Sequence, residues 1–460
     1  MSDQPLALRD YQLVARDFLR AHPRAGLFLD MGLGKTCVSL SALQPHHLPA
    51  LVLAPKRVAE TVWDAEAALW RPDLTVVKAI GSPAQRKDLL ARHADVTVLS
   101  RENQGDLASL PPGRPEFRTL ILDELSGYKG RGARWKSAVA FLKAYRVPYV
   151  WGLTGTPVSN GYLDVWPQIA LLDRGERLGK NISTYRSRYF YPGRTLPNGV
   201  VSSWELREGA EEKIKAKIED ICLYMESDGL VQLPEFTINY VPVRLPPRVK
   251  TAYREFAKKL LTDLTDVLGG EVVTAASRGV LTAKLSQVAA GQLYVDEAHT
   301  TMNGKYIELH SAKLDAVREI VEGSGSPVLV FYRFRHEFER LKKALPGSRS
   351  FTNDRYGADA ATLVRQWNEG KIPVLLAHPA SVGHGLNLQH GGHTAVWTSP
   401  PWDLDQWEQA NKRLHRSGQR HPVVIHVVVA PGTIDDLIIE RLAGKASVQQ
   451  DLLKHLESPL

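Results

Sequence analysis

Cysteine is scarce in this chain, and several other features are missing from it. Only two cysteines, Cys37 and Cys222, occur among 460 residues, which leaves no disulfide framework and no cysteine-based zinc site and is typical of a reducing compartment. The longest apolar run, residues 423–429, is interrupted by His426, and it is far shorter than the roughly 18 residues of a membrane span. The first residues show no basic-then-apolar signal, so we expect neither export nor a membrane partner.

The bulk composition is that of an ordinary globular protein. Hydrophobic residues make up 43% and charged residues 23% of the chain, and the length allows two or three domains, each with its own core. The net charge is +8, from 58 basic and 50 acidic residues. This modest excess is compatible with a polyanionic partner but does not establish one.

Strand-like apolar runs alternate with amphipathic helical stretches in two parts of the chain. In the first part the runs lie at residues 26–29, 50–54, 75–80, 96–100, 119–122 and 149–153. In the second part they lie at residues 328–332, 374–378, 395–398 and 423–429. This rhythm predicts an α/β fold with two parallel sheets, each covered by helices on both faces.

The segment between these two parts has a different composition. It is polar and punctuated by proline up to residue 247, and helical spacing begins at Lys250 and again at Val280. Residues 185–191 mix arginine with aromatic residues, which suits contact with nucleic acid and equally suits a small core with arginines outside. The sequence therefore predicts four regions: a first lobe at 1–172, a largely helical insertion and linker at 173–310, a second lobe at 311–430 and a terminal helix at 431–460.

A phosphate-binding loop is predicted at residues 29–36, which read Leu-Asp-Met-Gly-Leu-Gly-Lys-Thr. The loop follows a buried strand and precedes a helical pattern, so its backbone N–H groups and the positive end of the helix can face a nucleotide's phosphates. Lys35 would reach the β- and γ-phosphates, and the Thr36 hydroxyl would ligate Mg²⁺. Leu29 stands where the general pattern has its first glycine, so the loop alone does not decide the function.

Two adjacent acids, Asp123 and Glu124, follow the strand at residues 119–122. Beside a phosphate loop, Asp123 would hold Mg²⁺ and Glu124 would polarise the attacking water. A solvated acidic turn would explain the pair better if it stood alone, and the upstream loop favours the catalytic interpretation.

A basic cluster near the C-terminus contains Arg413 and Arg416. Helical spacing would place both side chains on one face, where two guanidinium groups suit the charge that develops on a transferring phosphoryl group. Taken by itself, the cluster is explained better as a basic helix end in solvent.

These motifs and several others resemble, in their order along the chain, those of superfamily 2 helicase-type ATPases, and specifically the Swi/Snf-type DNA translocases. The chain is similar to that family at residues 8–12, 30–36, 53–56, 99–102, 123–126, 153–157, 328–332, 381–388, 401–403 and 409–419. The most specific match is the last, which follows the family pattern Gln-Ala-x-x-Arg-x-His-Arg-x-Gly-Gln. The resemblance implies two RecA-like lobes that bind ATP and Mg²⁺ between them, and a bracing helix at residues 434–442.

The resemblance also implies roles for individual residues. The nucleotide-binding positions are Arg9, Gln12, Gly32, Gly34, Lys35, Thr36, Gly385 and Gln409, with Gln12 as the adenine contact. The catalytic positions are Lys35, Asp123, Glu124, Arg413 and Arg416, and the metal ligands are Thr36 and Asp123. The positions that face DNA in relatives are Lys56, Arg57, Ser100, Arg101, Asn387 and Trp402.

The chain departs from the family pattern at three places. Ser126 occupies the place of the usual histidine in the acidic box, so we expect the coupling between the ATP site and the DNA groove to be tuned differently. His384 replaces a small residue in the second-lobe motif, and the usual arginine pair before Leu233 and Pro234 is missing.

These observations predict an ATP-driven translocase that steps along double-stranded DNA, without sequence preference and without obligatory strand separation. The alternative is an unwinding helicase of the same superfamily that acts on DNA or RNA. A non-catalytic DNA-binding scaffold is a third interpretation, and the intact ATP-site residues argue against it. We expect a monomer in the cytoplasm of a bacterium or a phage-infected host cell, with too few residues outside the motifs for a histone-reading module; the sequence identifies no DNA-processing protein partner.

Overall fold

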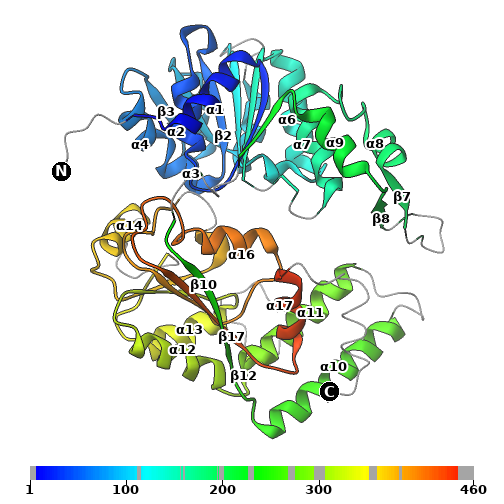
Figure 1. The fold of residues 1–460 in the computed structure, drawn as a ribbon, viewed down its shortest axis with the longest axis vertical. Coiled ribbons are helices and arrows are strands. Elements are labelled where there is room, and N and C mark those ends of the chain that lie inside the picture. The colour runs from blue at the N-terminus through cyan, green and yellow to red at the C-terminus, as the bar shows by residue number, and fades with distance from the viewer. Residues whose placement is uncertain are drawn as a thin grey trace. The chain divides into compact units, whose positions relative to one another are not determined.

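The structure is a computed structural model of the 460-residue chain. It describes residues 7–110, 116–155, 157–158, 161–193, 195, 201, 203–225, 230, 233–267, 275–294, 306–351, 360–382 and 386–443. Contacts divide the chain into two compact units, Met1–Gln232 and Leu233–Leu460. Each unit has its own sheet and its own cores (Figure 1).

The first unit is built on a parallel sheet. Among the described residues the sheet has seven strands in the order β3-β4-β2-β5-β6-β1-β9. They are β1 (Arg24–Leu29), β2 (Ala50–Ala54), β3 (Val76–Ala79), β4 (Val96–Ser100), β5 (Thr119–Asp123), β6 (Tyr149–Thr154) and β9 (Cys222–Met225). The first six coincide with the apolar runs of the sequence, because a parallel sheet covered on both faces needs apolar residues throughout its strands. Parallel pairing brings the carboxyl ends of these strands to one edge of the sheet, where ligands bind in open α/β folds.

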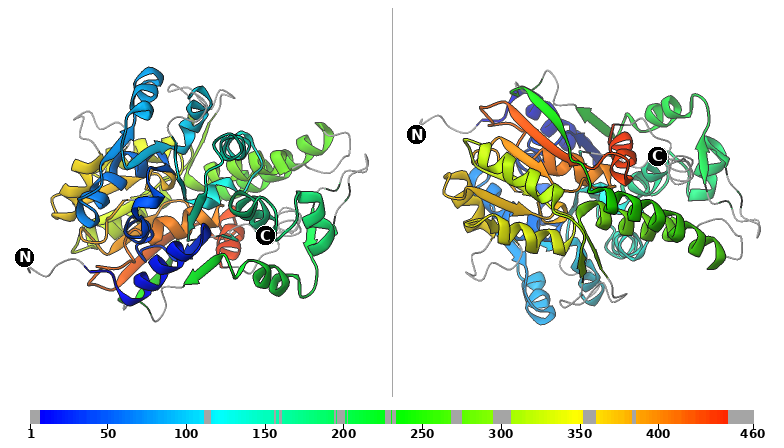
Figure 2. Two further views of the ribbon diagram at one scale, coloured as in Figure 1. Left: turned by 90° about the horizontal axis from the view of Figure 1, so that it is seen from above. Right: turned by 90° about the horizontal axis from the view of Figure 1, so that it is seen from below.

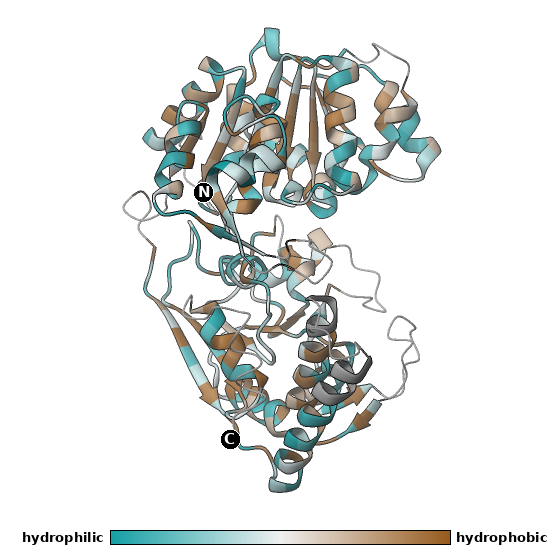
Figure 3. Cartoon of the chain, turned by 90° about the vertical axis from the view of Figure 1, so that its right-hand side faces the viewer, coloured by the Kyte–Doolittle hydropathy of each residue, from teal (hydrophilic) through white to brown (hydrophobic). Residues whose placement is uncertain are grey.

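Helices cover both faces of this sheet, and alternate residues of each strand contribute to two cores. Along β2, Leu51 and Leu53 belong to one core whereas Val52 belongs to the other. The core around Val52 lies under α1 (Asp10–Ala21), α2 (Lys35–Ala42), α3 (Lys56–Thr61) and α4 (Trp63–Trp70). The core around Leu51 lies under α5 (Pro83–Ala91), α6 (Ala133–Tyr145), α7 (Val165–Asp173) and α9 (Ala210–Ile218). Figure 3 shows apolar residues concentrated on the strands between these helices.

Short 3-10 segments and a small hairpin complete the first unit. The 3-10 segments are η1 (Pro45–His47), η2 (Arg101–Ser109), η3 (Leu125–Tyr128) and η4 (Tyr162–Asp164). The hairpin of β7 (Phe190–Pro192) and β8 (Trp204–Leu206) follows α8 (Ile182–Tyr189). Tyr185, Tyr189 and Phe190 join the core of the unit, whereas Tyr191 is exposed beneath the Arg207 guanidinium. Of the two interpretations of residues 185–191, a small core explains the three buried rings.

The second unit is built on another parallel sheet. Among the described residues the sheet has six strands in the order β10-β17-β16-β13-β15-β14. They are β10 (Phe236–Pro242), β13 (Val328–Phe331), β14 (Arg349–Ser350), β15 (Val374–Ala377), β16 (Thr394–Trp397) and β17 (Val423–Val429). Val328 and Val330 face a core under α12 (Ala312–Gly323) and α13 (Arg335–Ala344). Leu329 and Phe331 face a core that includes residues of α14 (Ala360–Asn368), α15 (Pro379–Val382) and α16 (Leu404–Asn411).

Three further helices form a separate apolar cluster in the second unit. They are α10 (Pro247–Val267), α11 (Ala275–Ala290) and α17 (Ile434–Leu442), and α17 lies beside α11 in Figures 1 and 2. A hairpin of β11 (Gln292–Tyr294) and β12 (Tyr306–Glu308) follows α11. Lys313 of α12 and Asp435 of α17 form an ion pair at 2.6 Å, and both side chains are only 2% exposed.

The α/β fold with two parallel-sheet, RecA-like lobes is confirmed. The predicted boundaries at 172, 310 and 430 stay predictions. The segment predicted as a largely helical insertion contains helices, but it also contributes β9 to the first sheet and β10 to the second. No helix in the described part of the chain is long and apolar enough to cross a membrane.

Candidate functional site

The predicted phosphate loop connects the end of β1 to the start of α2. Gly32 and Gly34 have φ angles of +89° and +81°, a left-handed conformation that glycine adopts without steric cost. The helix begins at Lys35, directly after Gly34. The Lys35 ammonium folds back onto the loop and donates hydrogen bonds to the carbonyl oxygens of Leu29 at 2.7 Å and Asp30 at 3.2 Å. The loop is therefore a tight turn with a cation inside it.

Gln12, the predicted adenine contact, is buried against this loop. Its Nε2 donates a hydrogen bond to the Leu33 carbonyl at 3.1 Å, and its Oε1 accepts one from the Arg9 backbone N–H at 2.9 Å. A Cβ atom at Gly34 would run into the Gln12 amide, so this glycine also lets α1 approach the loop closely. The Arg9 side chain is exposed. The structure places both residues beside the loop, and their nucleotide-binding roles stay predictions.

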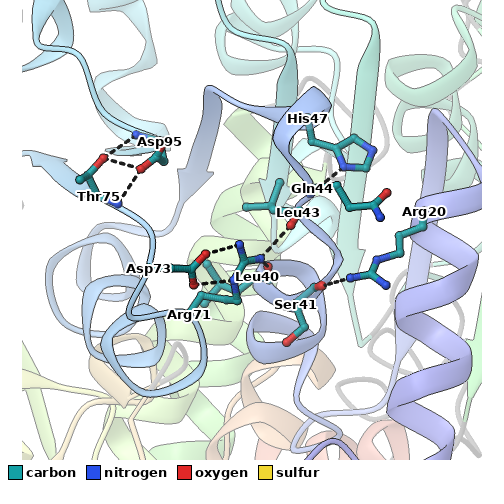
Figure 4. A network of polar contacts seen from close by, with 10 residues as sticks. All are labelled: Arg20, Leu40, Ser41, Leu43, Gln44, His47, Arg71, Asp73, Thr75 and Asp95. Carbon is teal, nitrogen blue, oxygen red and sulfur yellow. Dashed lines mark hydrogen bonds and ion pairs between the residues drawn. The ribbon is translucent and has the colours of Figure 1, made fainter.

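Two arginines hold the opposite end of α2 (Figure 4). Arg20, from α1, donates a hydrogen bond to the Ser41 carbonyl at 2.8 Å. Arg71, which follows α4, donates to the carbonyls of Leu40 at 3.1 Å and Leu43 at 2.8 Å. The last carbonyls of a helix lack intrahelical partners, and cations there also complement the negative end of the helix dipole. The helix that carries the phosphate loop is thus fixed at both ends.

Asp123 of the predicted acidic pair stands at the carboxyl end of β5. It is 8% exposed, and its Oδ2 accepts a hydrogen bond from the Trp63 indole at 2.9 Å. Burial, and then the neighbouring Glu124 carboxylate, raise the pKa of Asp123 to about 6, although the Trp63 hydrogen bond and the charges of Lys35 and Arg101 oppose the rise. A divalent cation would remove the repulsion that raises this pKa.

Glu124 has an unusual backbone conformation beside Asp123. Its φ of +56° and ψ of +64° lie in the left-handed region, where a non-glycine residue is strained, as often occurs at functional sites. Its Oε1 accepts hydrogen bonds from Ser126 Oγ at 3.1 Å and Thr154 Oγ1 at 3.4 Å. Thr154 ends β6, and a Cβ atom at the next residue, Gly155, would lie 3.4 Å from the Leu29 carbonyl oxygen. The phosphate loop, the acidic pair and the end of β6 therefore meet at one edge of the sheet.

This arrangement fits a magnesium nucleotide. In the sheet order, β6 lies between β1 and β5, and neighbouring strands are about 4.8 Å apart, so the loop and the acidic pair are separated by roughly 10 Å. Thr36 is half-buried in the first turn of α2, where its hydroxyl could ligate a metal ion held by Asp123. The described residues contain no group of three or more His, Cys, Asp or Glu side chains that could hold a metal. Mg²⁺ commonly binds one carboxylate together with substrate phosphates, so a larger protein cage is not required.

In the second unit, the helical spacing predicted for residues 409–419 is wrong. α16 ends at Asn411, whose Oδ1 accepts a hydrogen bond from the Trp397 indole at 2.9 Å, and residues 412–418 form turns. Arg413 and Arg416 therefore do not share a helix face. Tertiary contacts of the Asn411 side chain and the residues after it replace the helix that local spacing suggests.

Arg413 and Arg416 nevertheless meet at one carbonyl oxygen. The Nη1 atoms of both residues donate hydrogen bonds to the Leu386 carbonyl, at 3.3 Å from Arg413 and 3.5 Å from Arg416. Arg413 is 6% exposed, and its Nε also donates to the carbonyl of Gln409 at 3.0 Å. Gln409 at the end of α16 and Arg413 and Arg416 in the turns after it therefore lie close together. Their roles at a nucleotide stay predictions.

Gln419, the last residue of this motif, has a structural role that the sequence did not suggest. Its Nε2 donates hydrogen bonds to the carbonyls of Gln389 at 2.9 Å, Gly392 at 3.1 Å and Leu414 at 3.3 Å. Its Oε1 accepts the backbone N–H groups of the next two residues at 2.9 Å and 3.0 Å. One buried side chain thus joins the turns after α16 to the loop before β16.

The predicted DNA-facing residues fall into two groups. Four are exposed or half-buried: Lys56, Arg57, Asn387 and Trp402. The other two, Ser100 and Arg101, are only 4% and 9% exposed. Ser100 Oγ donates to the Glu102 carboxylate at 2.7 Å, and Arg101 Nη1 donates to the Glu124 carbonyl at 3.3 Å. The polar groups of Ser100 and Arg101 are therefore engaged within the protein.

The sequence interpretation missed Trp63 at the acidic pair. It named Arg101 as a DNA contact and did not foresee that this side chain faces the acidic pair. Trp63 is completely buried, and a buried indole N–H needs an acceptor, so its place in the amphipathic stretch at residues 58–70 was an available signal. Nothing in the local sequence indicates the direction of the Arg101 side chain. The predicted residues Thr156, His384 and Gly385 lie outside the described residues.

Comparisons with known proteins agree with the motifs. The family profile for the SNF2-related domain matches residues 18–289. A protein of Acyrthosiphon pisum secondary endosymbiont phage 1, named putative protein p41, is 35% identical over 469 residues that cover 98% of each chain. The putative ATP-dependent helicase/translocase YwqA of Bacillus subtilis is 23% identical, over 97% of this chain and 49% of its own length. The chain therefore spans about half of that relative.

Among solved structures, the Sulfolobus solfataricus SWI2/SNF2 ATPase core in complex with dsDNA covers 98% of this chain and 93% of its own, with 20% identity and a TM-score of 0.44. The family assignment rests instead on the profile and on the phage relative. The profile covers more than half of the residues, and the phage protein aligns over nearly its full length. The chain therefore belongs to the SNF2-related domain family, and the resemblance to Swi/Snf-type superfamily 2 ATPases is confirmed.

Proposed function

We propose that this protein is a DNA-dependent ATPase that translocates on double-stranded DNA, without sequence preference and without obligatory strand separation. The observation that carries the proposal is the edge of the first sheet, where the Lys35 loop and the Asp123–Glu124 pair meet. Family membership supports ATP as the nucleotide. We propose Mg²⁺ as its metal ion, a monomer as the working form and the cytoplasm as its location.

The residues of the first unit divide the work of hydrolysis. Lys35 and the backbone N–H groups at the start of α2 would hold the β- and γ-phosphates. Thr36 and Asp123 would hold Mg²⁺, which when bound neutralises charge on the phosphate oxygens. Glu124 would orient the attacking water, and the Ser126 and Thr154 hydroxyls hold one oxygen of its carboxylate. Behind these groups, β5 is completely buried and β6 is buried except at Tyr149.

The residues of the second unit would act on the charge that develops during transfer. Arg413 and Arg416 present guanidinium groups around one carbonyl, and arginines that reach a transferring phosphoryl group contribute about 10³- to 10⁵-fold in rate. Lys56, Arg57, Asn387 and Trp402 are the candidates for contact with DNA. Contacts of this kind with phosphates give binding that is sensitive to salt and independent of sequence.

The ATPase rate measured with a panel of nucleic acids tests the proposal. Stimulation by duplex DNA, together with displacement of a third strand from a triplex, is the expected result. Stimulation by single strands or RNA alone, with strand separation on forked substrates, would instead identify an unwinding helicase. Hydrolysis that no nucleic acid stimulates would contradict both.

Two variants test the assigned residues. Lys35→Ala is expected to abolish turnover and leave DNA binding measurable, because Lys35 lies in the phosphate loop and is not among the residues proposed to contact DNA. Arg416→Ala is expected to lower kcat far more than nucleotide affinity, because its contact would form mainly in the transition state. Unchanged hydrolysis in the first variant, or equal losses of rate and affinity in the second, would refute the respective assignment.

A further inference from the structure

Arg101 lies where the sequence predicts a DNA contact, but its guanidinium faces the acidic pair. β4 ends at Ser100, and η2 begins at Arg101. The residue is 9% exposed; its Nη1 donates to the Glu124 carbonyl at 3.3 Å, and its Nε donates to the Glu102 carboxylate at 3.3 Å. The guanidinium therefore links the end of β4 to the end of β5.

The segment that follows Glu124 leaves room for this side chain. A Cβ atom at Gly127, in η3, would overlap the Arg101 guanidinium. Gly127 is not one of the described glycines with a positive φ, so its backbone conformation does not require glycine. The close approach of Arg101 is the one reason in the structure for glycine at this position.

Three further hydrogen bonds join η2 to η3, one directly and two through Arg134. The Tyr128 hydroxyl donates to Gln104 Oε1 at 2.8 Å. Arg134 donates to the Gly127 carbonyl at 3.1 Å, and the Arg134 carbonyl accepts a hydrogen bond from Gln104 Nε2. η2 is thus also held against η3 at Gln104, one turn beyond Arg101. A change in the position of one segment must be accommodated by the other.

Glu124 depends on this support more than an ordinary residue would. Its backbone is in the left-handed region, a conformation that persists only when surrounding contacts determine it. Rotation of its peptide away from Arg101 would also turn its carboxylate away from the Ser126 and Thr154 hydroxyls. The Arg101 bond to the Glu124 carbonyl is therefore well placed to hold the carboxylate in its direction.

We infer that Arg101 is a positioning residue of the hydrolytic site, which holds the backbone of Glu124 so that its carboxylate faces the attacking water. This inference rests on the proposed function, because it assigns Arg101 to the same ATP site. It differs from the role that the resemblance implies, in which the side chain contacts DNA. Hydrolysis then depends on Arg101 whether or not DNA is bound.

The test compares Arg101→Gln, Arg101→Lys and Gly127→Ala with Arg92→Gln, an exposed arginine at the end of α5 that serves as a matched control. Arg101→Gln is expected to lower kcat by roughly 10- to 100-fold, both with and without duplex DNA, since small misplacements of catalytic groups have effects of this size. The KM for ATP and the Kd for duplex DNA are expected to stay within about threefold of wild type.

The other variants separate positioning from simple loss of charge. Gly127→Ala is expected to reproduce the loss of kcat although Arg101 is still present, because the added methyl group displaces the guanidinium. Arg101→Lys is expected to be intermediate, since an ammonium can donate to the Glu124 carbonyl but lacks the planar fork.

Two results would overturn the inference. One is an Arg101→Gln variant with unchanged kcat but weaker DNA binding. The log Kd of such a variant would depend less steeply on log salt by about one unit, as loss of one phosphate contact predicts. The other concerns amide hydrogen exchange of residues 124–128, which is expected to be faster in Arg101→Gln than in wild type; an unchanged rate would mean that the contact does not form. Hydrogen exchange can be measured without ATP turnover. If the wild-type protein hydrolyses no ATP, the proposed function is refuted, and the hydrogen-exchange rates still test the Arg101 contact.

Discussion

Substitution of Asp123 by asparagine is expected to make the nucleotide-free protein more stable at neutral pH. Burial and the Glu124 carboxylate raise the pKa of Asp123 from 3.8 to about 6. At about 1.4 kcal/mol per pKa unit, this rise corresponds to roughly 3 kcal/mol that the ionised carboxylate costs the folded state. The amide of the substituted side chain would keep an oxygen acceptor for the Trp63 indole, so the variant removes the charge and retains the hydrogen bond.

The pH dependence follows from the direction of this shift. Between pH 4 and pH 6 the folded state binds a proton at Asp123 that the unfolded state has released, so the free energy of unfolding falls as pH rises through this range. The Asp123→Asn variant lacks this loss. We therefore expect it to exceed wild type by about 1–3 kcal/mol at pH 7.5, and the difference to vanish near pH 4.

The assay is urea unfolding between pH 4 and pH 8, followed by hydrogen exchange of peptides from β5 and β6, which report on the first unit. Asp73→Asn is the matched control, because the hydrogen bond from Arg71 lowers the pKa of Asp73. This control is expected to be no more stable than wild type at pH 7.5, with any loss disappearing as pH falls. A difference between Asp123→Asn and wild type that is absent, or that does not change with pH, would refute the reasoning.

Two further predictions concern the phosphate loop and the second unit. Gly34→Ala is expected to weaken nucleotide binding at least 10-fold in a calorimetric titration, because the added methyl group would meet the Gln12 amide at a left-handed φ of +81°. The control is Gly130→Ala, whose added methyl group would meet no atom within 4 Å. Equal nucleotide affinities of the two variants would contradict the assignment of the loop. Asp435→Asn is expected to destabilise the second unit by about 3–5 kcal/mol in urea unfolding, because it leaves the Lys313 ammonium buried without its carboxylate. A decrease in the free energy of unfolding below about 1 kcal/mol would show that the ion pair is solvated.

The strands that carry the first-unit site could be predicted because buried strands consist mainly of apolar residues. β2, β4 and β5 are completely buried, and each appears as a mainly apolar run, interrupted in β4 by Thr97. The position of Lys35 followed from the end of the apolar run at β1, and that of the Asp123–Glu124 pair from the end of β5. Parallel pairing then places these groups at one edge without any knowledge of long-range contacts.

The edge strands could not be predicted in the same way. All seven residues of β10 are exposed or half-buried, so the strand shows no apolar run. Its pairing with β17 comes from backbone hydrogen bonds, which the sequence does not indicate. The turns after α16 could not be predicted from the sequence for a related reason. Their path is set by side-chain hydrogen bonds of Arg413 and Gln419 to distant carbonyls, and these bonds outweigh the helical spacing of the motif.

Because α2 is short, the proposed nucleotide site depends on residues that would not themselves touch a nucleotide. This helix has only eight residues, and isolated helices shorter than about 12 residues do not persist in water. Its rigidity must therefore be supplied from outside, in part by Arg20 and Arg71 at the end remote from the loop. If the loop binds phosphates as proposed, we therefore expect nucleotide affinity to depend on these two arginines, which lie about 12 Å, one helix length, from the loop.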